Sequence, residues 1–251
     1  MTSTDITGQA AIVTGASRGF GRAITIALSK AGAQVTGIAR DPAPLADLAA
    51  ELGGSFTPVA TDAADPVVAG RLIDEHQPTI LVLNAGAAPL SRPIQRHTWQ
   101  TFSQNWDVDV RHAFGWVREA LLAPLPAGSV VVAMSSGAAL RGSPLSGGYA
   151  GAKATIRFLA SYAAAESARG GLGIRFISLL PQLTPATRLG AAAVAAYAAR
   201  QGTDVPGYLA AAGPTLTTEQ VGSTVTELIA DPGQDQDAYL LTAGGLSPLP
   251  Q

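Results

Sequence analysis

A tyrosine and a lysine, Tyr149 and Lys153, stand four residues apart in an Ala-rich segment that is typical of a helix. Residues four apart lie on one helix face, so the phenol and the ammonium would be neighbours. A fixed positive charge favours the ionised form of a phenol, which a proton-transfer residue working near neutral pH requires. The same spacing also occurs in solvated surface pairs, so other motifs in the chain are needed to distinguish a catalytic pair from a surface pair.

Two serines, Ser135 and Ser136, come shortly before this pair, directly after the apolar run 129–134. That run predicts a buried strand, which a Gly/Pro/Ser-rich turn region then connects to the helix. A serine hydroxyl at the end of the strand could hydrogen-bond the same substrate oxygen as Tyr149. The residues alone do not choose between the two serines.

A glycine-rich loop follows the first predicted strand, Ala10–Thr14. Its glycines, Gly15, Gly19 and Gly21, have the spacing G-x-x-x-G-x-G, and a helical pattern and a second strand come next. Glycines let the backbone approach a pyrophosphate, and a helix N-terminus offers free N–H groups and a positive dipole end. An ordinary strand-to-helix turn can also contain glycines. The strand–loop–helix–strand order favours a dinucleotide site.

The end of the second strand bears on the choice of cofactor. An NAD site usually has an acidic residue there, which binds the ribose 2′-hydroxyl. This chain has Ala39 followed by Arg40, and Arg18 lies inside the glycine loop. Two guanidiniums can bind a 2′-phosphate in bidentate fashion, whereas Asp41 comes one position late. If the arginines are not merely solvated loop charges, the sequence predicts NADP(H) over NAD(H).

Strand and helix patterns alternate along the rest of the chain. This alternation predicts an α/β fold with a single doubly wound, Rossmann-like parallel sheet of about seven strands and helices on both faces. No linker, repeat or composition shift divides residues 1–251, so we expect one domain. The remaining expected strands are 33–39, 56–60, 80–83, 129–134, 174–180 and 238–242, and the expected helices are 45–52, 66–76, 98–122, the Tyr149 segment, 186–200 and 217–230.

Composition excludes several classes of function. Apolar residues make up 47% of the 251 residues, the net charge is −2 without a basic block, and cysteine is absent. This argues against nucleic-acid or membrane-surface binding and rules out disulfides and thiolate metal sites. The three histidines show no metal-ligand spacing, so we expect no metal. No signal peptide and no apolar run near ~18 residues is present, which predicts a cytoplasmic protein.

Taken together, the motifs resemble those of the short-chain dehydrogenase/reductase family. Thr14–Gly21 matches the family's cofactor loop, Asn84-Ala85-Gly86 matches its N-A-G motif, and Tyr149–Lys153 matches its Y-x-x-x-K motif. Ser136 stands thirteen residues before Tyr149, which is the family's usual offset for the catalytic serine, so we choose it over Ser135. The resemblance covers nearly the whole chain.

The resemblance implies hydride transfer between a nicotinamide and a carbonyl or alcohol carbon. Tyr149 would be the general acid in reduction, Lys153 would support it and bind the nicotinamide ribose, and Ser136 would hold the substrate oxygen. Asp62, after the third strand, resembles the acidic residue that contacts the adenine. With the two arginines, the expected cofactor contacts are Gly15, Ser17, Arg18, Gly19, Phe20, Gly21, Arg40, Asp62, Asn84, Ala85, Gly86, Tyr149, Lys153, Pro181, Gln182 and Thr184.

Asp109 is the main departure from the family's pattern, since an asparagine usually stands there and supports a water chain that carries protons to the lysine. An ionised aspartate accepts hydrogen bonds but donates none. It could still order a water next to Lys153, and it would tend to raise the pKa of that lysine. We count Asp109 among the catalytic residues, with either a working or an altered relay.

Further departures follow the sixth predicted strand. The family's Pro-Gly becomes Pro181-Gln182, and its usual threonine position falls near Ala186. Thr184 or Thr187 could then take over the contact with the cofactor's carboxamide or phosphates. One asparagine precedes Ala85 where the family commonly has two.

The segment 184–214 is expected to form a substrate lid. It is rich in alanine, which suggests an apolar substrate, although the alanines could equally pack a helix on the body or on another subunit. By analogy with the family, we expect a homotetramer or homodimer formed through helices 98–122 and 147–169.

The leading hypothesis is therefore an NADPH-dependent carbonyl reductase or alcohol dehydrogenase that acts on a small molecule. Two alternatives stay open: a family member with non-redox chemistry, such as a dehydratase, isomerase or cyclase, and a non-enzymatic NADP sensor.

Overall fold

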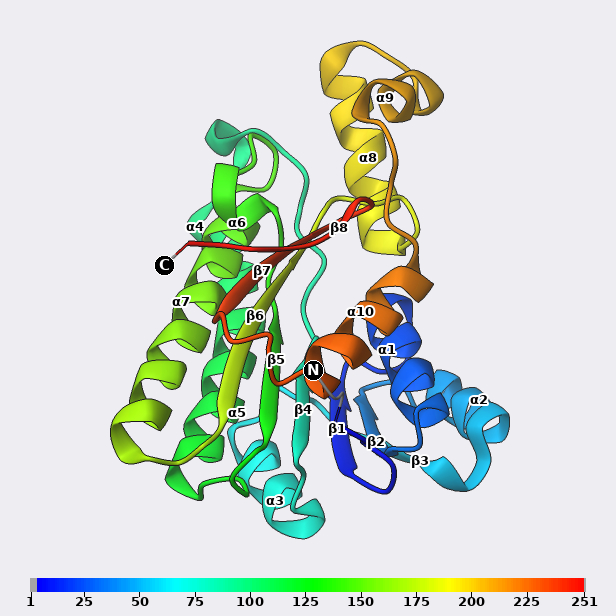
Figure 1. The fold of residues 1–251 in the computed structure, drawn as a ribbon. Helices are drawn as coiled ribbons and strands as arrows, with labels where there is room; N and C mark the ends of the chain where they lie inside the picture. The colour runs from blue at the N-terminus through cyan, green and yellow to red at the C-terminus, as the bar shows by residue number, and fades with distance from the viewer. Residues whose placement is uncertain (1–3, 251) are drawn as a thin grey trace.

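The computed structural model describes residues 4–250, and one eight-stranded sheet with the order β3-β2-β1-β4-β5-β6-β7-β8 forms its centre (Figure 1). Strands β1 to β7 run parallel, whereas β8 runs antiparallel to β7. The chain order reverses beside β1, where open α/β sheets bind ligands. The strands are β1 (Ala10–Thr14), β2 (Gln34–Ala39), β3 (Phe56–Ala60), β4 (Ile80–Leu83), β5 (Val130–Met134), β6 (Arg175–Pro181), β7 (Ala238–Thr242) and β8 (Gly245–Pro248).

Helices cover both faces of the sheet. In Figure 1, α1, α2 and α10 lie on one side and α3, α5 and α7 on the other. The helices are α1 (Gly19–Lys30), α2 (Pro42–Leu52), α3 (Pro66–His76), α4 (Trp99–Asn105), α5 (Arg111–Leu122), α6 (Ala138–Arg141), α7 (Gly147–Gly170), α8 (Arg188–Gln201), α9 (Val205–Ala212) and α10 (Thr218–Ala230), with short 3-10 turns η1 (Gly53–Ser55) and η2 (Ile94–Arg96) and a π-helical segment η3 (Trp106–Val110).

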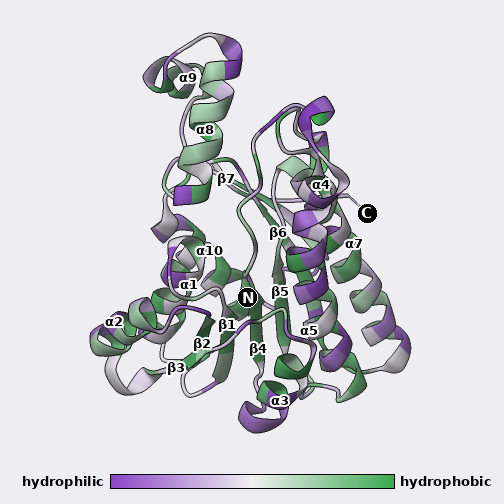
Figure 2. Ribbon diagram, turned by 180° about the vertical axis from the view of Figure 1, so that it is seen from behind, coloured by the Kyte–Doolittle hydropathy of each residue, from purple (hydrophilic) through white to green (hydrophobic). Residues whose placement is uncertain are grey.

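The side chains of each central strand alternate between two apolar cores. Val13 and Val82 belong to the core beneath α1, α2 and α10, whereas their neighbours Ile12 and Leu81 belong to the core beneath α3, α5 and α7. Strands buried on both faces read as continuous apolar runs, which is why the sequence reveals them. Figure 2 shows these hydrophobic strands at the centre of the molecule. The predicted α/β fold with a mostly parallel sheet is confirmed.

The sheet has eight strands, one more than the sequence predicted. The additional strand, β8, folds back on β7 with Leu240 opposite Ser247 and Leu241 opposite Leu246. Its sequence, GLSP, is short and ends in proline, which normally indicates a turn. Proline is tolerated here because β8 is an edge strand and its outer side needs no ladder hydrogen bond.

The expected helix 98–122 is divided into α4, η3 and α5. The five residues of η3 have π-helical geometry, and such segments occur frequently at functional sites. Asp109 lies in η3 and is fully buried. Helices α6 and α9 were not predicted, because both are short.

Helices α8 and α9 form a lobe beyond the carboxyl ends of the parallel strands (Figure 1). The rings of Tyr197 in α8 and Tyr208 in α9 stack with centroids 6.3 Å apart and 10° between their planes. The Tyr197 hydroxyl also contacts the Ser143 hydroxyl, which joins the lobe to the segment between β5 and α7. Among residues 4–250, no helix has both the length and the apolar character needed to cross a membrane.

Candidate active site at the carboxyl edge of the sheet

The loop between β1 and α1 has a backbone that only small residues allow. Gly15 has φ +68°, and a methyl group at this position would lie 2.9 Å from Asn84 Nδ2 and 3.0 Å from Ala85 Cα. Both the positive φ and the lack of space require glycine. Ser17 is half-buried, and Phe20 packs against the core beneath α1.

The N-terminus of α1 is suited to an anion. Its N-cap residue, Arg18, has no side-chain hydrogen bond to the first turn, whereas Asp41 caps α2 and Asp65 caps α3. The first-turn N–H groups of α1 therefore have no side-chain partner from the N-cap residue. Free amides and a positive dipole end fit a pyrophosphate.

The N-A-G turn holds the glycine loop in place. Asn84 Nδ2 donates to the backbone oxygens of Thr14 (3.1 Å) and Gly15 (3.3 Å). The buried Thr14 hydroxyl accepts from the backbone N–H groups of Asn84 (2.9 Å) and Ala85 (3.1 Å) and donates to Val82 O (3.3 Å). Thr14 was included in the cofactor-loop motif from the sequence but was given no role, although a hydroxyl at the end of an apolar strand is a signal for one.

The two arginines predicted to read the ribose are both exposed. Among residues 4–250, neither Arg18 nor Arg40 forms an ion pair. The Asp41 carboxylate is exposed as well, and its Oδ1 accepts from Ala43 N (3.1 Å) as the cap of α2. Asp62 is exposed after β3 and accepts from Ala64 N (3.0 Å).

The two candidate serines have different surroundings. Ser135 is buried, and its hydroxyl donates to the backbone oxygen of Lys153 (2.7 Å), so it joins β5 to α7. Ser136 is half-buried, and its Oγ accepts from Ala138 N (3.2 Å), which leaves the hydroxyl hydrogen free to donate. The geometry therefore separates a structural serine from one that can bind a ligand.

Lys153 lies buried beside Tyr149, with Nζ 5.6 Å from the centroid of the tyrosine ring. Its ammonium donates to Met134 O (3.1 Å) and lies 3.2 Å from Asp109 Oδ2. Burial by itself lowers the pKa of Lys153, but the Asp109 carboxylate, the Tyr149 hydroxyl and the contact with Asp109 outweigh it, so the pKa is raised. The lysine is a buried, charged group.

Asp109 connects this lysine to the N-A-G turn. Its Oδ1 accepts from Ala87 N (2.7 Å) and, at 3.4 Å, from Asn105 Nδ2. Asn105 Nδ2 also donates to Ala87 O (2.8 Å), so the amide supports both partners. A methyl group at Gly86 would lie 2.8 Å from Asp109 Oδ2, which places the carboxylate directly against the turn. Asn105 and Ala87 were missed from the sequence, although Asn105 stands one helical turn before Asp109.

His112 is the other buried titratable group beside this pair. Within residues 4–250 its Nε2 has no hydrogen-bond partner, and burial, followed by the charge of Lys153, lowers its pKa to about 3. His112 is therefore neutral near pH 7. The described residues contain no group of three or more potential metal ligands.

The segment after β6 lies over the glycine loop. Pro181 O accepts from Gly137 N (2.9 Å), and Gln182 Nε2 donates to Pro214 O (3.4 Å). Thr184 is 2% exposed, and its hydroxyl donates to Leu216 O. Thr187 caps α8, and its Cγ2 lies 3.5 Å from the point that a Cβ of Gly19 would occupy. Of the two threonines, Thr187 is the one next to the glycine loop.

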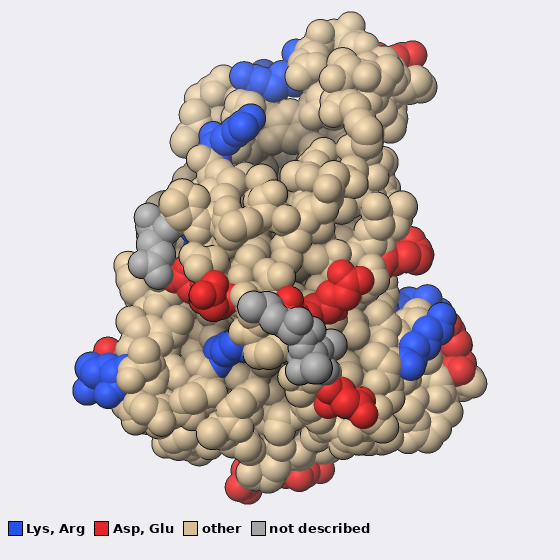
Figure 3. Space-filling model, in the orientation of Figure 1, with Lys and Arg blue, Asp and Glu red and all other residues tan. Residues whose placement is uncertain are grey.

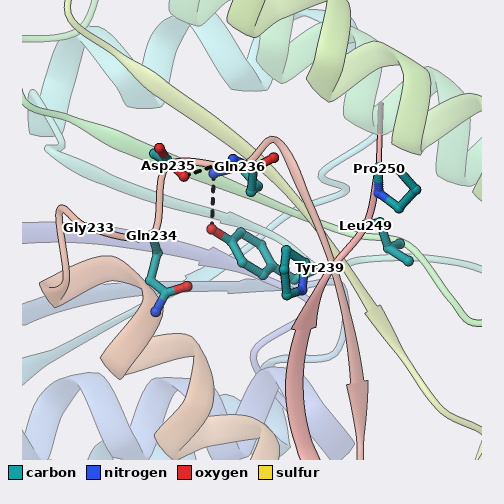
Figure 4. A pocket seen from close by; sticks show the side chains of 8 residues that line it. Gly233, Gln234, Asp235, Gln236, Tyr239, Leu249 and Pro250 are labelled. Carbon is teal, nitrogen blue, oxygen red and sulfur yellow. Dashed lines mark hydrogen bonds between the residues drawn. The ribbon is translucent and has the colours of Figure 1, made fainter.

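Two cavities lie at different distances from Ser136, Tyr149 and Lys153. One, of about 420 Å³, is lined by the segments 233–236 and 248–250 and by Tyr239, whose hydroxyl accepts from Gln236 N at 3.0 Å (Figure 4). It lies before β7, at the amino ends of the strands, where open parallel sheets do not bind their ligands. The other, of about 390 Å³, reaches Gly147 in the first turn of α7.

Known proteins are similar to this chain in sequence and in fold. A D-erythrulose reductase of Gallus gallus is 36% identical over 104 residues, which are 41% of this chain and 42% of that protein, so the chain aligns with less than half of that relative. A 3beta-hydroxysteroid dehydrogenase of Mediterraneibacter gnavus is 28% identical over 233 residues, 87% of this chain and 84% of that protein. A Beutenbergia cavernae dehydrogenase solved with bound NADP at low occupancy has a TM-score of 0.78, with 26% identity and 92% of each chain covered.

The family model for short chain dehydrogenases matches residues 9–198, which include the glycine loop, the N-A-G turn and the Tyr149–Lys153 pair. The match covers well over half of the chain. It agrees with the resemblance that the motifs indicate. The chain therefore belongs to the short-chain dehydrogenase family of oxidoreductases.

Proposed function

We propose that this protein is an NADPH-dependent carbonyl reductase, acting in reverse as an alcohol dehydrogenase, with Tyr149 as the general acid and base. The observation that carries the proposal is the buried Lys153 ammonium, held by Met134 and Asp109 beside the Tyr149 ring. A fixed cation stabilises the phenolate that remains once the proton has gone to the substrate oxygen. A lysine that served only as a solvated surface charge would not be buried between two such partners.

Each polar residue has a stated task in this proposal. The nicotinamide, when bound, supplies or accepts the hydride. The Tyr149 hydroxyl gives its proton to the developing alkoxide, and Ser136 donates its free hydroxyl hydrogen to the same oxygen. Lys153 holds positive charge next to the phenol, and Asp109 keeps that charge in place.

The preference for NADPH rests on Arg18 and Arg40. Both guanidiniums are exposed, and neither has an ion-pair partner among residues 4–250, so both are free to bind a phosphate. Bidentate contacts of this kind suit the 2′-phosphate. The carboxylate of Asp41 comes one position after Arg40, and its Oδ1 is directed at the first turn of α2 as the N-cap.

We also propose that residues 184–214 cover the substrate and that α5 and α7 join subunits. The first proposal is supported by Thr187 beside Gly19 and by the contact of Tyr197 with Ser143. The second is supported by exposed apolar side chains on α5 and α7, among them Phe114 (53%) and Phe158 (52%). Light scattering should give a smaller mass for Phe158→Glu than for the wild type; equal masses would contradict this role of α7.

The experiment that tests the function measures the loss of NADPH absorbance with a panel of ketones. Tyr149→Phe removes only the hydroxyl and should lower kcat by about 100-fold or more. Tyr162→Phe is the matched control, because Tyr162 is exposed on the same helix. Unchanged activity in Tyr149→Phe would overturn the assigned acid. NADPH binding without turnover of any carbonyl would favour non-redox chemistry or a sensor.

A further inference from the structure

The cavity near the first turn of α7 has two arginines and no carboxylate in its wall. Arg92 belongs to the segment that follows the N-A-G turn, and Arg200 belongs to the last turn of α8. Figure 3 shows basic side chains beside the hollow beneath the α8–α9 lobe. The wall also includes His97, Phe102, Ser143 and Gly147.

Neither arginine has a compensating negative charge. Among residues 4–250, no carboxylate forms an ion pair with Arg92 or Arg200. The only side-chain hydrogen bond found for the Arg92 guanidinium within this range is a long one to Arg96 O (3.5 Å). Two like charges in one cavity wall repel each other, and a bound anion would relieve this repulsion. A guanidinium also has the fork geometry that matches carboxylate and phosphate oxygens.

The backbone around the cavity is held in place before any ligand arrives. Arg92 N donates to Leu145 O (2.8 Å), and His97 Nε2 donates to Arg92 O (3.2 Å). Tyr197 lies one turn before Arg200 in α8, and its hydroxyl contacts Ser143, which lines the cavity. Contacts that fix a site in advance reduce the entropy lost when a ligand binds.

We propose that this cavity binds a carboxylate or phosphate group of the carbonyl substrate and that Arg92 and Arg200 hold it. The inference rests on the proposed reductase function, because it places the substrate relative to Tyr149. Gly147 lines the cavity and stands two residues before Tyr149 in α7. In this proposal the substrate extends from an anion held in the cavity, along the first turn of α7, to the Tyr149 hydroxyl. The substrate then has one charged end, in contrast to the wholly apolar molecule that the alanine-rich lid suggested.

The test compares matched ketones on the NADPH-loaded full-length protein. The probes are levulinate and its longer homologues, the corresponding methyl ketones with a terminal hydroxymethyl group, and the phosphate monoesters of those alcohols. The values of kcat/KM are measured for the wild type, Arg92→Gln, Arg200→Gln and the double variant. Arg96→Gln is the matched control, because Arg96 lies in the same segment but does not line the cavity.

We expect the wild type to prefer an anionic ketone over its neutral counterpart by about tenfold or more, as the loss of a charge-assisted hydrogen bond implies. Each single substitution should reduce this ratio, the double variant should abolish it, and Arg96→Gln should retain it. Comparison of the carboxylate and phosphate series identifies the anion. Equal rates for neutral and anionic ketones, or a preference that survives in the double variant, would overturn the anion site while leaving the reductase intact.

Failure of the reductase itself would give a different result, namely no turnover of any ketone. Calorimetric titration of the same probes into the NADPH-loaded protein then decides the anion site independently. Binding that the wild type shows and the double variant lacks would support the site. Absence of binding to the wild type would overturn it.

Discussion

The Asp109 carboxylate lies 3.2 Å from the Lys153 ammonium, and both groups are buried between the N-A-G turn and α7. Burial disfavours both charges, so each depends on the other. The carboxylate reaches the lysine directly, in contrast to the water-linked asparagine that the family resemblance led us to consider. In the proposed mechanism Asp109 is therefore a positioning residue for Lys153.

Asp109→Asn should destabilise the protein, because it leaves the Lys153 ammonium buried without a counter-charge. The amide oxygen can still accept from Ala87 N, so the hydrogen bond to the turn is kept and only the counter-charge is lost. We expect this to lower the free energy of unfolding by about 2–4 kcal/mol, measured with urea. Asp107→Asn, at an exposed position in the same π-helical segment, should change the free energy of unfolding by less than about 0.5 kcal/mol.

The pH dependence gives a second readout of the same pair. The folded pKa of Lys153 is raised above 10.5, because the Asp109 carboxylate and Tyr149 outweigh the lowering effect of burial. The stabilisation is therefore fully present below pH 10.5 and is lost as the pH rises through the folded value. Stability curves of the wild type and Asp109→Asn that coincide below this pH would contradict the role of the pair.

Gly86→Ala should disturb this pair through space alone. The added methyl group would lie 2.8 Å from Asp109 Oδ2 and 3.0 Å from Cγ, so the carboxylate or the turn must move. We expect a loss of about 1–3 kcal/mol in unfolding free energy, together with a lower kcat. Gly115→Ala, in α5, is the matched control because a methyl group there meets nothing within 4 Å. If both variants were equally stable, the close packing of Asp109 against the turn would be wrong.

Local patterns predicted most of the fold. Apolar strands alternate with helical segments, and the glycine loop, the N-A-G turn and the Tyr149–Lys153 spacing are each contained in a few consecutive residues. Strand β8 escaped prediction because its Gly/Pro composition resembles a turn. The π-helical geometry of η3 also escaped, because its residues continue an ordinary helical pattern.

The partners of the site residues depend on tertiary structure. The contact between Asp109 and Lys153, and the hydrogen bonds of Asp109 and Asn105 with Ala87, join segments that are far apart along the chain. Spacing within one segment cannot reveal such a contact. The same holds for Thr187, which reaches Gly19 only because the segment after β6 crosses the carboxyl edge of the sheet, past β5 and β4, to the glycine loop.

His112→Phe should flatten the acid limb of the stability profile. The pKa of His112 is lowered from 6.5 to about 3, chiefly by burial and then by the Lys153 charge, so the unfolded chain binds a proton that the folded chain does not. The stability that His112 contributes is lost as the pH falls from 6.5 towards 3. At about pH 5 the loss is about 2 kcal/mol, and urea titrations at pH 7 and pH 5 should show it in the wild type but not in the variant. Equal losses in both proteins would show that His112 takes up a proton in the folded state.

Arg40→Asp should weaken NADP(H) binding and improve NAD(H) binding. The substitution removes one of the two guanidiniums proposed to bind the 2′-phosphate, and it introduces a carboxylate that could accept from the 2′-hydroxyl of NAD(H). Losing a charge-assisted contact should raise the Kd for NADPH by about 10–100-fold, measured by fluorescence titration. Arg71→Gln, on α3, is the control, because Arg71 pairs with Glu75 outside the glycine loop and should leave both constants unchanged. If the wild type binds NADH as tightly as NADPH, or if Arg40→Asp leaves their ratio unchanged, the arginines do not select the cofactor.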